Sequence, residues 1–388
     1  MPHPGGSGAR RGRGAALTSS ARRAGALLLG VALAGCATRG IALGEQGVLV
    51  TGGEVRGDHV SGQMQTFFQR PAGRLRPRHY PIVFLHGSRM TGAAFLGTPD
   101  GRPGWATWFL SHGWPVYVVD QPGKGRSGYF PSRYGPQEHD PSRKQIMERF
   151  TAPATLDQAP WPTAGLHTQW PGSGKPGDPI FEQFVGTEVA NMPDVRLQYA
   201  LTVKGVSALL DRIGPAIIVT HSQAGPLGWM IAQASPGRVK AIIAVEPTGN
   251  ANREGKGPAV PCGVTIDCLA FRPGLSGPKE LDLIRTPTDG ARGVDCWLQR
   301  APRYRLVGLD GIPILITTGE ASYHAGQDYC TSAFLTQAGV RNDYVYLPDA
   351  GFRGNGHLQM LERNSDALAG WYEQWLLRHL DGAPAGEP

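Results

Sequence analysis

Along most of the chain, short runs of aliphatic and β-branched residues alternate with longer helical patterns. Runs of four or five apolar residues are typical of strands that are covered on both faces. Strands that alternate with helices predict an α/β fold, in which a mostly parallel central sheet has right-handed crossovers and helices on both faces. We expect strands at 82–85, 116–119, 216–219, 241–245, 312–316 and 344–347, and helices near 101–112, 196–213, 223–234, 325–338 and 358–379.

The segment before the first of these runs has a different pattern. Residues 40–60 indicate a strand, a turn at Gly52-Gly53 and a second strand, and residues 64–69 indicate a further strand. With 388 residues, the chain is long enough to bury a substantial core. We expect one large domain over residues 36–388.

Two long segments interrupt the alternation. Residues 129–185 are rich in proline, glycine and aromatic residues, and residues 249–310 hold three of the four cysteines that follow Cys36. Each segment follows an expected strand, so each should lie near the carboxyl edge of the sheet, where ligands bind. Long loops in a compact domain are commonly lids or binding loops, so we expect lid-like insertions. The alternative is that they are surface loops without a function.

The N-terminus has the pattern of an export signal. Residues 1–35 combine arginines with a 12-residue apolar run, Ala24–Gly35, which is too short to cross a bilayer as a helix. Leu33-Ala34-Gly35-Cys36 resembles a bacterial lipobox, which implies that cleavage leaves a lipidated Cys36 as the first residue. An ordinary signal peptide with an incidental cysteine is the alternative. We therefore expect an exported protein on a bacterial membrane surface, at the outer membrane or the periplasmic face.

The net charge gives no support for a nucleic-acid partner. Of the net charge of +7, five positive charges belong to arginines of residues 1–35, which contain no acidic residue, so the rest carries +2. A nearly neutral body implies no large basic surface, and we expect no nucleic-acid binding. The sequence does not indicate the oligomeric state.

The cysteine content favours two disulfide bonds. An even number of cysteines in an exported protein is typical of a disulfide framework, and four cysteines allow three pairings. The short separation of Cys262 and Cys268 favours a local loop, which leaves Cys296 with Cys330. A metal site is less favoured, because no Cys-x-x-Cys pair or nearby histidine ladder is present.

The clearest functional signal surrounds Ser222. The apolar run 217–219 leads into Thr220-His221-Ser222-Gln223-Ala224, and a helical pattern follows at once. A serine between a strand and a helix, flanked by small residues two positions away, is typical of a nucleophile elbow. Thr220 and Ala224 stand where glycine is usual. The strand before Ser222 and the helix after it nevertheless favour a nucleophile at this position. The alternative is that the segment is a buried strand that ends in a polar loop.

A serine nucleophile needs a histidine as its base. We expect His357, because it lies in the glycine-rich stretch 349–360 after the last expected strand. His221 adjoins the serine, so its side chain should point the other way, and His86 is more typical of structural packing. His324, in a polar loop near the expected rim of the site, is the remaining competitor.

Two carboxylates compete to be the acid that orients the histidine. Glu246 ends the strand after the nucleophile helix, and Glu320 ends the next strand. Both strand ends reach the same edge of the sheet, so topology does not choose between them. A carboxylate at a buried strand end before a proline is unusual unless it is paired, which favours Glu246. Either acid could instead form a surface ion pair.

The expected oxyanion hole consists of two backbone N–H groups. One belongs to Gln223, which follows the nucleophile. The other comes from the glycine-containing loop after strand 82–85, where Ser88 or Arg89 would donate it. The sequence does not choose between these two residues.

Several stretches together resemble the α/β-hydrolase superfamily, and in particular exported bacterial esterases with a Ser–Glu–His triad. In that group the acid follows the strand next to the nucleophile, which implies Glu246. Some of those esterases carry disulfide-bonded adjacent cysteines where this chain has Ser88 and Arg89, which leaves the choice of substrate open. The stretches are 47–53, 86–92, 98–105, 119–127, 221–223, 245–247 and 354–357, and the resemblance covers roughly 45–130, 186–250 and 311–380.

These residues predict a serine carboxylic-ester hydrolase that works through an acyl-enzyme intermediate. Ser222 would attack the ester carbonyl and His357 would move the proton, with no cofactor or metal. An acyltransferase or an amidase could use the same triad, and a non-catalytic lipoprotein that serves as a binding module is the rival from another class. The substrate is expected to be a small-molecule or polymer ester, which the sequence does not identify.

Overall fold

The computed structural model describes residues 40–72, 80–249, 260–287, 294–301 and 303–380. The chain divides into two units, Met1–Gly40 and Ile41–Pro388, and every element given below belongs to the second unit. The predicted export signal over residues 1–35 and the predicted anchor at Cys36 lie outside the described residues and stay predictions. Among the helices of the described ranges, none is long and apolar enough to cross a membrane.

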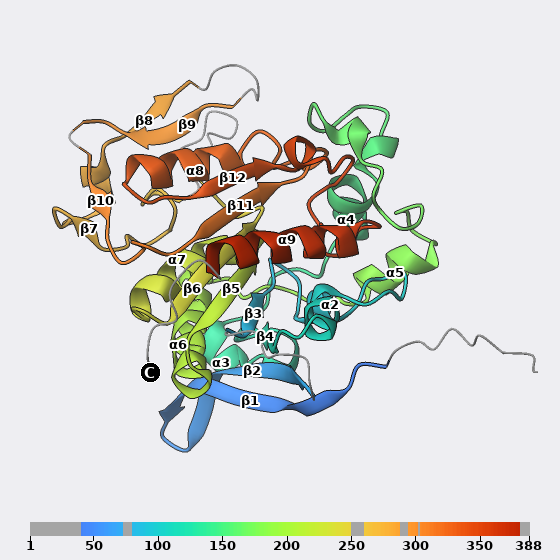
Figure 1. The fold of residues 1–388 in the computed structure, drawn as a ribbon, viewed down its shortest axis with the longest axis horizontal. Coiled ribbons are helices and arrows are strands. Elements are labelled where there is room, and N and C mark those ends of the chain that lie inside the picture. The colour runs from blue at the N-terminus through green and yellow to red at the C-terminus, as the bar shows by residue number, and fades with distance from the viewer. Residues whose placement is uncertain (1–39, 73–79, 250–259, 288–293, 302, 381–388) are drawn as a thin grey trace, which may run out of the picture. The chain divides into compact units, whose positions relative to one another are not determined.

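One large sheet organises the described chain. Its strands are β1 (Leu43–Arg56), β2 (His59–Pro71), β3 (Ile82–Leu85), β4 (Val116–Asp120), β5 (Ala216–His221), β6 (Val239–Val245), β11 (Ile314–Thr318) and β12 (Asp343–Tyr346). They lie in the order β1-β2-β4-β3-β5-β6-β11-β12 (Figure 1). Neighbours from β4 to β12 are parallel, whereas β2 is antiparallel to both β1 and β4. The predicted α/β fold with a mostly parallel sheet is confirmed, and the six strands predicted from the apolar runs are present.

The hairpin at the start of the sheet differs from its prediction. The turn predicted at Gly52-Gly53 is wrong, because β1 continues through both glycines and the chain turns after Arg56. A Cβ on Gly52, whose φ is 68°, would lie 3.1 Å from the Cα of Gly205 in the helix that covers this strand. The glycine therefore permits close packing of a helix on the strand, a requirement that the local sequence does not show.

Different helices cover the two faces of the sheet (Figure 1). In strand β3, Ile82 and Phe84 face one helical layer, whereas Val83 and Leu85 face the other. Because the whole strand is buried, it reads as a continuous apolar run. One layer contains α2 (Trp105–Ser111) and α9 (Ser365–Leu380), and the other contains α6 (Val195–Ile213), α7 (Gly225–Ala234) and α8 (Asp328–Gln337).

Short elements fill the connections and the two insertions. The described part of 249–310 forms two small antiparallel sheets, β7 with β10 and β8 with β9. Its elements are β7 (Phe271–Arg272), η6 (Pro278–Leu281), β8 (Leu283–Thr286), β9 (Cys296–Gln299) and β10 (Arg305–Leu306). Residues 129–185 contain α3 (Pro131–Tyr134), α4 (Arg143–Ile146), the π-helix η2 (Met147–Thr151), η3 (Pro153–Thr155), η4 (Ala164–Leu166) and α5 (Pro179–Val185). Elsewhere lie α1 (Ala93–Leu96), η1 (Gly125–Ser127), η5 (Ser222–Ala224) and η7 (Leu347–Ala350).

Two disulfide bonds connect the four cysteines of the described chain. Cys262 is bonded to Cys268, and Cys296 is bonded to Cys330. The pairing that the short spacing favoured is confirmed. The second bond ties strand β9 of the insertion to helix α8 of the main layer.

Loss of the Cys296–Cys330 bond should destabilise the protein more than loss of the Cys262–Cys268 bond. The bonds close loops with sequence separations of 34 and 6 residues, for which the entropy of the unfolded chain predicts about 4 and about 2 kcal/mol. Urea unfolding of the two double Cys→Ser variants measures both losses. Equal losses, or free thiols at these four positions in the denatured, unreduced protein, would contradict the expectation.

Candidate active site

Ser222 occupies the sharp turn between β5 and α7. Its backbone φ is 54°, in the left-handed region that residues with a side chain rarely adopt. The chain then makes one 3-10 turn, η5, before it enters α7. Ser222 therefore lies at the carboxyl edge of the sheet, with the strained backbone that a nucleophile elbow requires.

Two glycines make room for this turn. A Cβ on Gly225 would lie 2.3 Å from the Cβ of Pro247, so α7 can approach the end of β6 only without a side chain there. A Cβ on Gly87 would lie 2.8 Å from Nδ1 of His221 and 3.0 Å from the Cβ of Ser222. The loop after β3 therefore passes directly against the candidate nucleophile.

Replacing Gly87 by alanine should lower the rate of any reaction that uses Ser222, by about 10- to 100-fold, because the added methyl group displaces either the serine or the loop. Steady-state turnover of an ester measures the loss. Gly97→Ala is the matched control, since the nearest atom to a Cβ there is 3.7 Å away and its φ is −161°. Full activity of the Gly87→Ala variant would show that the loop tolerates the methyl group.

His357 and Glu246 form a direct, buried pair. Nδ1 of His357 lies 2.5 Å from Oε2 of Glu246, and the two side chains are 2% and 0% exposed. The carbonyl oxygen of His357 lies 3.0 Å from Nε2 of His221. Ser222 and His357 line one pocket of about 1080 Å³. The structure therefore brings together the three residues that the sequence singled out as nucleophile, base and favoured acid.

The carboxylate of Glu246 is held by several donors. Oε1 accepts hydrogen bonds from the N–H of Gly319 at 2.7 Å and from Gln359 at 3.2 Å, and Oε2 also accepts one from Ser322. Burial raises the pKa of Glu246 well above its ordinary value, the carboxylate of Asp328 raises it further, and the hydrogen bonds oppose the rise. The backbone of Glu246 is left-handed as well, with φ of 49°. These constraints fix the carboxylate opposite Nδ1 of the histidine.

Glu320, the competing acid, has other partners. Its carboxylate accepts hydrogen bonds from Arg353 and from the N–H of Gly354, both at 2.8 Å. Both donors precede His357 in the same loop. Glu320 therefore holds the loop that carries the histidine, whereas Glu246 contacts the imidazole itself.

The other three candidate histidines have different partners: His86 and His221 contact backbone groups, and His324 pairs with a second acid, Asp328. His86 contacts the carbonyl oxygen of Gly87 and the N–H of Gln121, at 2.9 and 3.2 Å, in the structural role that the sequence predicted. Burial lowers the pKa of His86 to about 4 and that of His221 to about 3, so both are neutral near pH 7. His324 lies 2.7 Å from Asp328, and the centre of its ring is 4.8 Å from that of His357.

One group of described side chains is close enough to hold a metal ion. Ligand atoms of Glu246, His324 and His357 all lie within 4.8 Å of one another. However, the oxygens of Glu246 already accept hydrogen bonds, and Nδ1 of His324 faces Asp328. The donor set therefore fits a hydrogen-bonded acid–base cluster better than an open coordination site.

Asn191 organises the loop after β3, and the sequence analysis missed it. Its side-chain oxygen accepts the N–H of Arg89 at 2.9 Å, and its Nδ2 donates to the hydroxyl of Ser88 at 3.0 Å. Arg89 has a left-handed φ of 59°. The N–H of Ser88, by contrast, has no acceptor among the described residues. No motif surrounds Asn191, so only the folded structure shows this contact.

Aromatic residues form part of the pocket wall. Phe150 and Trp161, from the insertion 129–185, line the pocket, and the ring of Phe150 stacks on that of His357 with 5.6 Å between centres. The hydroxyl of Tyr323, a second residue that the sequence analysis missed, lies 3.3 Å from Nε2 of His357. Ile266 and Val294 of the second insertion also line the pocket.

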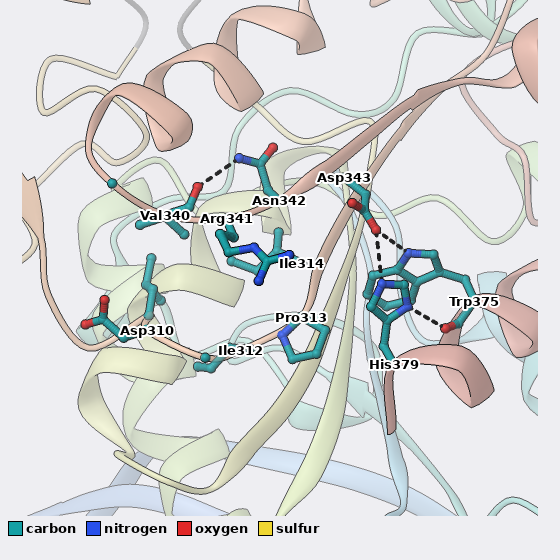
Figure 2. A pocket seen from close by; sticks show the side chains of 13 residues that line it. Asp310, Ile312, Pro313, Ile314, Val340, Arg341, Asn342, Asp343, Trp375 and His379 are labelled. Atoms are coloured by element: carbon teal, nitrogen blue, oxygen red, sulfur yellow. Dashed lines mark hydrogen bonds and ion pairs between the residues drawn. The ribbon is translucent and has the colours of Figure 1, made fainter. Parts of the chain in front are cut away.

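A smaller pocket of about 290 Å³ lies at the opposite ends of β11 and β12 (Figure 2). Three of the polar groups there bind one another: Asp343 accepts a hydrogen bond from Trp375 at 2.7 Å and lies 3.4 Å from Nε2 of His379. It contains neither Ser222 nor His357. The larger pocket is therefore the candidate active site.

The strand order and the turn at Ser222 are typical of an α/β-hydrolase, and comparison with known proteins supports this class. "Probable secreted lipase phiG" of a fungal species (strain ATCC 74256) is 41% identical over 302 residues, which are 76% of this chain and 81% of that protein. A bacterial esterase structure has a TM-score of 0.58 at 21% identity and covers 88% of this chain and 97% of its own. No family model matches the chain. The chain belongs to the α/β-hydrolase superfamily.

Proposed function

We propose that the protein is a serine carboxylic-ester hydrolase with Ser222 as nucleophile, His357 as base and Glu246 as acid. The observation that carries the proposal is the buried 2.5 Å pair of His357 and Glu246, in a pocket that Ser222 lines at a strained turn. A buried acid that holds Nδ1 leaves Nε2 of the histidine to serve the nucleophile. The 41% identical secreted lipase supports an ester substrate and an exported protein.

In the proposed reaction, Nε2 of His357 takes the proton of Ser222 as the serine oxygen attacks the ester carbonyl. The imidazolium then protonates the leaving alcohol, and an acyl-serine remains. Water, deprotonated by the same imidazole, attacks the acyl carbonyl; the imidazolium returns that proton to the serine oxygen as the acyl bond breaks, which releases the acid and restores the free serine. Glu246 keeps the imidazole in the productive tautomer and stabilises its positive charge in both halves of the reaction.

The oxyanion of each tetrahedral intermediate would be stabilised by two backbone N–H groups, those of Gln223 and Ser88. Ser88 is preferred to Arg89 because the N–H of Arg89 is already donated to Asn191. Asn191 therefore fixes the loop and leaves the N–H of Ser88 available. We propose further that the insertion 129–185 acts as a lid, because Phe150 and Trp161 bring its aromatic rings to the pocket.

A pre-steady-state measurement tests the proposed mechanism. Stopped-flow hydrolysis of p-nitrophenyl butanoate should show a burst of one equivalent of nitrophenol per enzyme, followed by slower turnover, because an activated ester acylates the serine faster than water releases the acyl group. A binding module would show neither phase. An acyltransferase would turn over well only when an alcohol acceptor is added, and an amidase would prefer the matching anilide.

We also propose that the chain is exported and anchored through a lipid on Cys36. Wild-type protein should then incorporate labelled fatty acid and partition into detergent, whereas Cys36→Ser protein should do neither. Metabolic labelling in a bacterial host followed by detergent phase separation makes the measurement. Wild-type protein that never takes up label would contradict the anchor while leaving the hydrolase proposal intact.

A further inference from the structure

One acid on the pocket wall has no part in the proposed mechanism. Glu188 lines the same pocket as Ser222. The N–H of its neighbour Val189 donates to the carbonyl oxygen of Arg89 at 2.7 Å. The segment that carries Glu188 is therefore fixed to the loop that also carries Ser88, beside the place where the oxyanion would form.

The two carboxyl oxygens of Glu188 have different surroundings. Oε1 is buried and has no hydrogen-bond partner in the described part of the chain. Oε2 makes no hydrogen bond with the described residues either, and unlike Oε1 it is not buried. A buried carboxyl oxygen without a donor disfavours the ionised form of the group.

The nearby cations do not supply the missing donor. Lys124, from the loop after β4, donates to the carbonyl oxygen of Ala190 at 3.1 Å and to the side chain of Asn191 at 2.5 Å. Arg89, from the loop after β3, donates to the carbonyl oxygen of His139 and lies 3.4 Å from Glu138.

These contacts leave the proton with Glu188 at neutral pH. Burial raises its pKa to about 8, against the opposing charges of Lys124 and Arg89. Burial also lowers the pKa of Lys124 to about 8. Near pH 7, Glu188 is therefore mainly a neutral acid with an O–H to donate.

We propose that Glu188 binds the substrate through Oε2 and selects esters that carry a hydrogen-bond acceptor in addition to the scissile ester. The inference rests on the proposed hydrolase function and deepens it by naming a class of substrate. An acceptor on the substrate receives the O–H of Glu188 in the pocket. A plain alkyl chain at the same place leaves that donor without an acceptor, which disfavours its binding.

Two pairs of esters with equal chain lengths test the proposal. Ethyl 3-methoxypropanoate and ethyl pentanoate differ by one ether oxygen on the acyl side, and 2-methoxyethyl butanoate and butyl butanoate differ in the same way on the alcohol side. The readout is the ratio of kcat/KM for the ether to that for the plain ester. In at least one pair, the wild-type ratio should exceed that of Glu188→Leu by about fivefold near pH 7.

Two further variants separate hydrogen bonding from charge. Glu188→Gln keeps a neutral donor and should keep the ratio within about twofold of the wild type. Glu148→Gln, at a pocket-lining acid that pairs with Lys144 at 3.7 Å, should leave the ratio unchanged. A ratio that is the same in wild type and Glu188→Leu for both pairs overturns the proposal.

The pH profile supplies the readout that a structural role would not move. The wild-type ratio should fall as pH rises through about 8, because the ionised acid has no proton to donate. The charged groups around it are Lys124 and Arg89, with Glu138 beyond Asn191. The Glu188→Gln ratio should stay flat. If it falls in parallel with the wild type, the titration of Lys124 is responsible and the proposal fails. Wild-type turnover of the plain esters tests the hydrolase function separately.

Discussion

Replacement of Ser222 by alanine should reduce ester hydrolysis by about 10⁴-fold or more. The hydroxyl oxygen forms the acyl-enzyme bond in the proposed mechanism, so alanine removes the atom that His357 and Glu246 would activate. The fold should be preserved, because the change removes one atom from a small side chain that is 9% exposed. Turnover of p-nitrophenyl butanoate and thermal unfolding of the two proteins make the comparison.

Ser88→Ala is the matched control for Ser222→Ala. Ser88 lines the same pocket, but its proposed role uses only the backbone N–H. Its hydroxyl bonds to Asn191, so the variant should lose about tenfold or less. A Ser222→Ala protein that retains a tenth of the wild-type rate would contradict the choice of nucleophile.

Glu246→Gln should impair hydrolysis about as severely as His357→Ala, within roughly tenfold. The amide cannot hold the imidazole in the same tautomer, and it carries no charge to stabilise the imidazolium. In the wild type, Gly319, Ser322 and Gln359 each donate a hydrogen bond to the carboxylate that the amide replaces. Turnover of the same p-nitrophenyl ester, with circular dichroism as a check of folding, measures the effect.

Glu320→Gln separates the acid that contacts the imidazole from the acid that holds its loop. Glu320 binds Arg353 and Gly354, so the variant should retain most of its activity and show its effect mainly in stability. The side chain of Arg353 is 71% exposed, and ion pairs with an exposed partner contribute little to the free energy of unfolding, so the loss of stability should be small. Inactive Glu320→Gln with active Glu246→Gln would reverse the assignment.

The sheet could be predicted because its strands are buried on both faces. Residues 216–219, for example, are apolar at every position because each of them is buried, so the sequence alone indicates a strand. The hairpin turn was predicted wrongly, because Gly52 is required by the approach of Gly205, more than 100 residues away in sequence. Local patterns cannot show a requirement of that kind.

The candidate site was predictable where a residue is tied to a strand end or a glycine-rich loop. Ser222 and His357 have such positions, and Glu246 was favoured by its buried context. The choice between Glu246 and Glu320 depends on which carboxylate reaches Nδ1 of the histidine, a distance that only the fold determines. Asn191 was missed because its contact with Ser88 spans 103 residues and leaves no local pattern.

The central claim is that Ser222 is a nucleophile activated by the buried His357–Glu246 pair, and covalent labelling tests it most directly. A fluorophosphonate should react once per wild-type molecule, and mass spectrometry of the digested protein should locate the adduct on Ser222. Labelling and loss of hydrolysis should proceed at the same rate, and His357→Ala and Glu246→Gln should label far more slowly. An adduct on another residue, or hydrolysis that continues after Ser222 is fully labelled, would contradict the account.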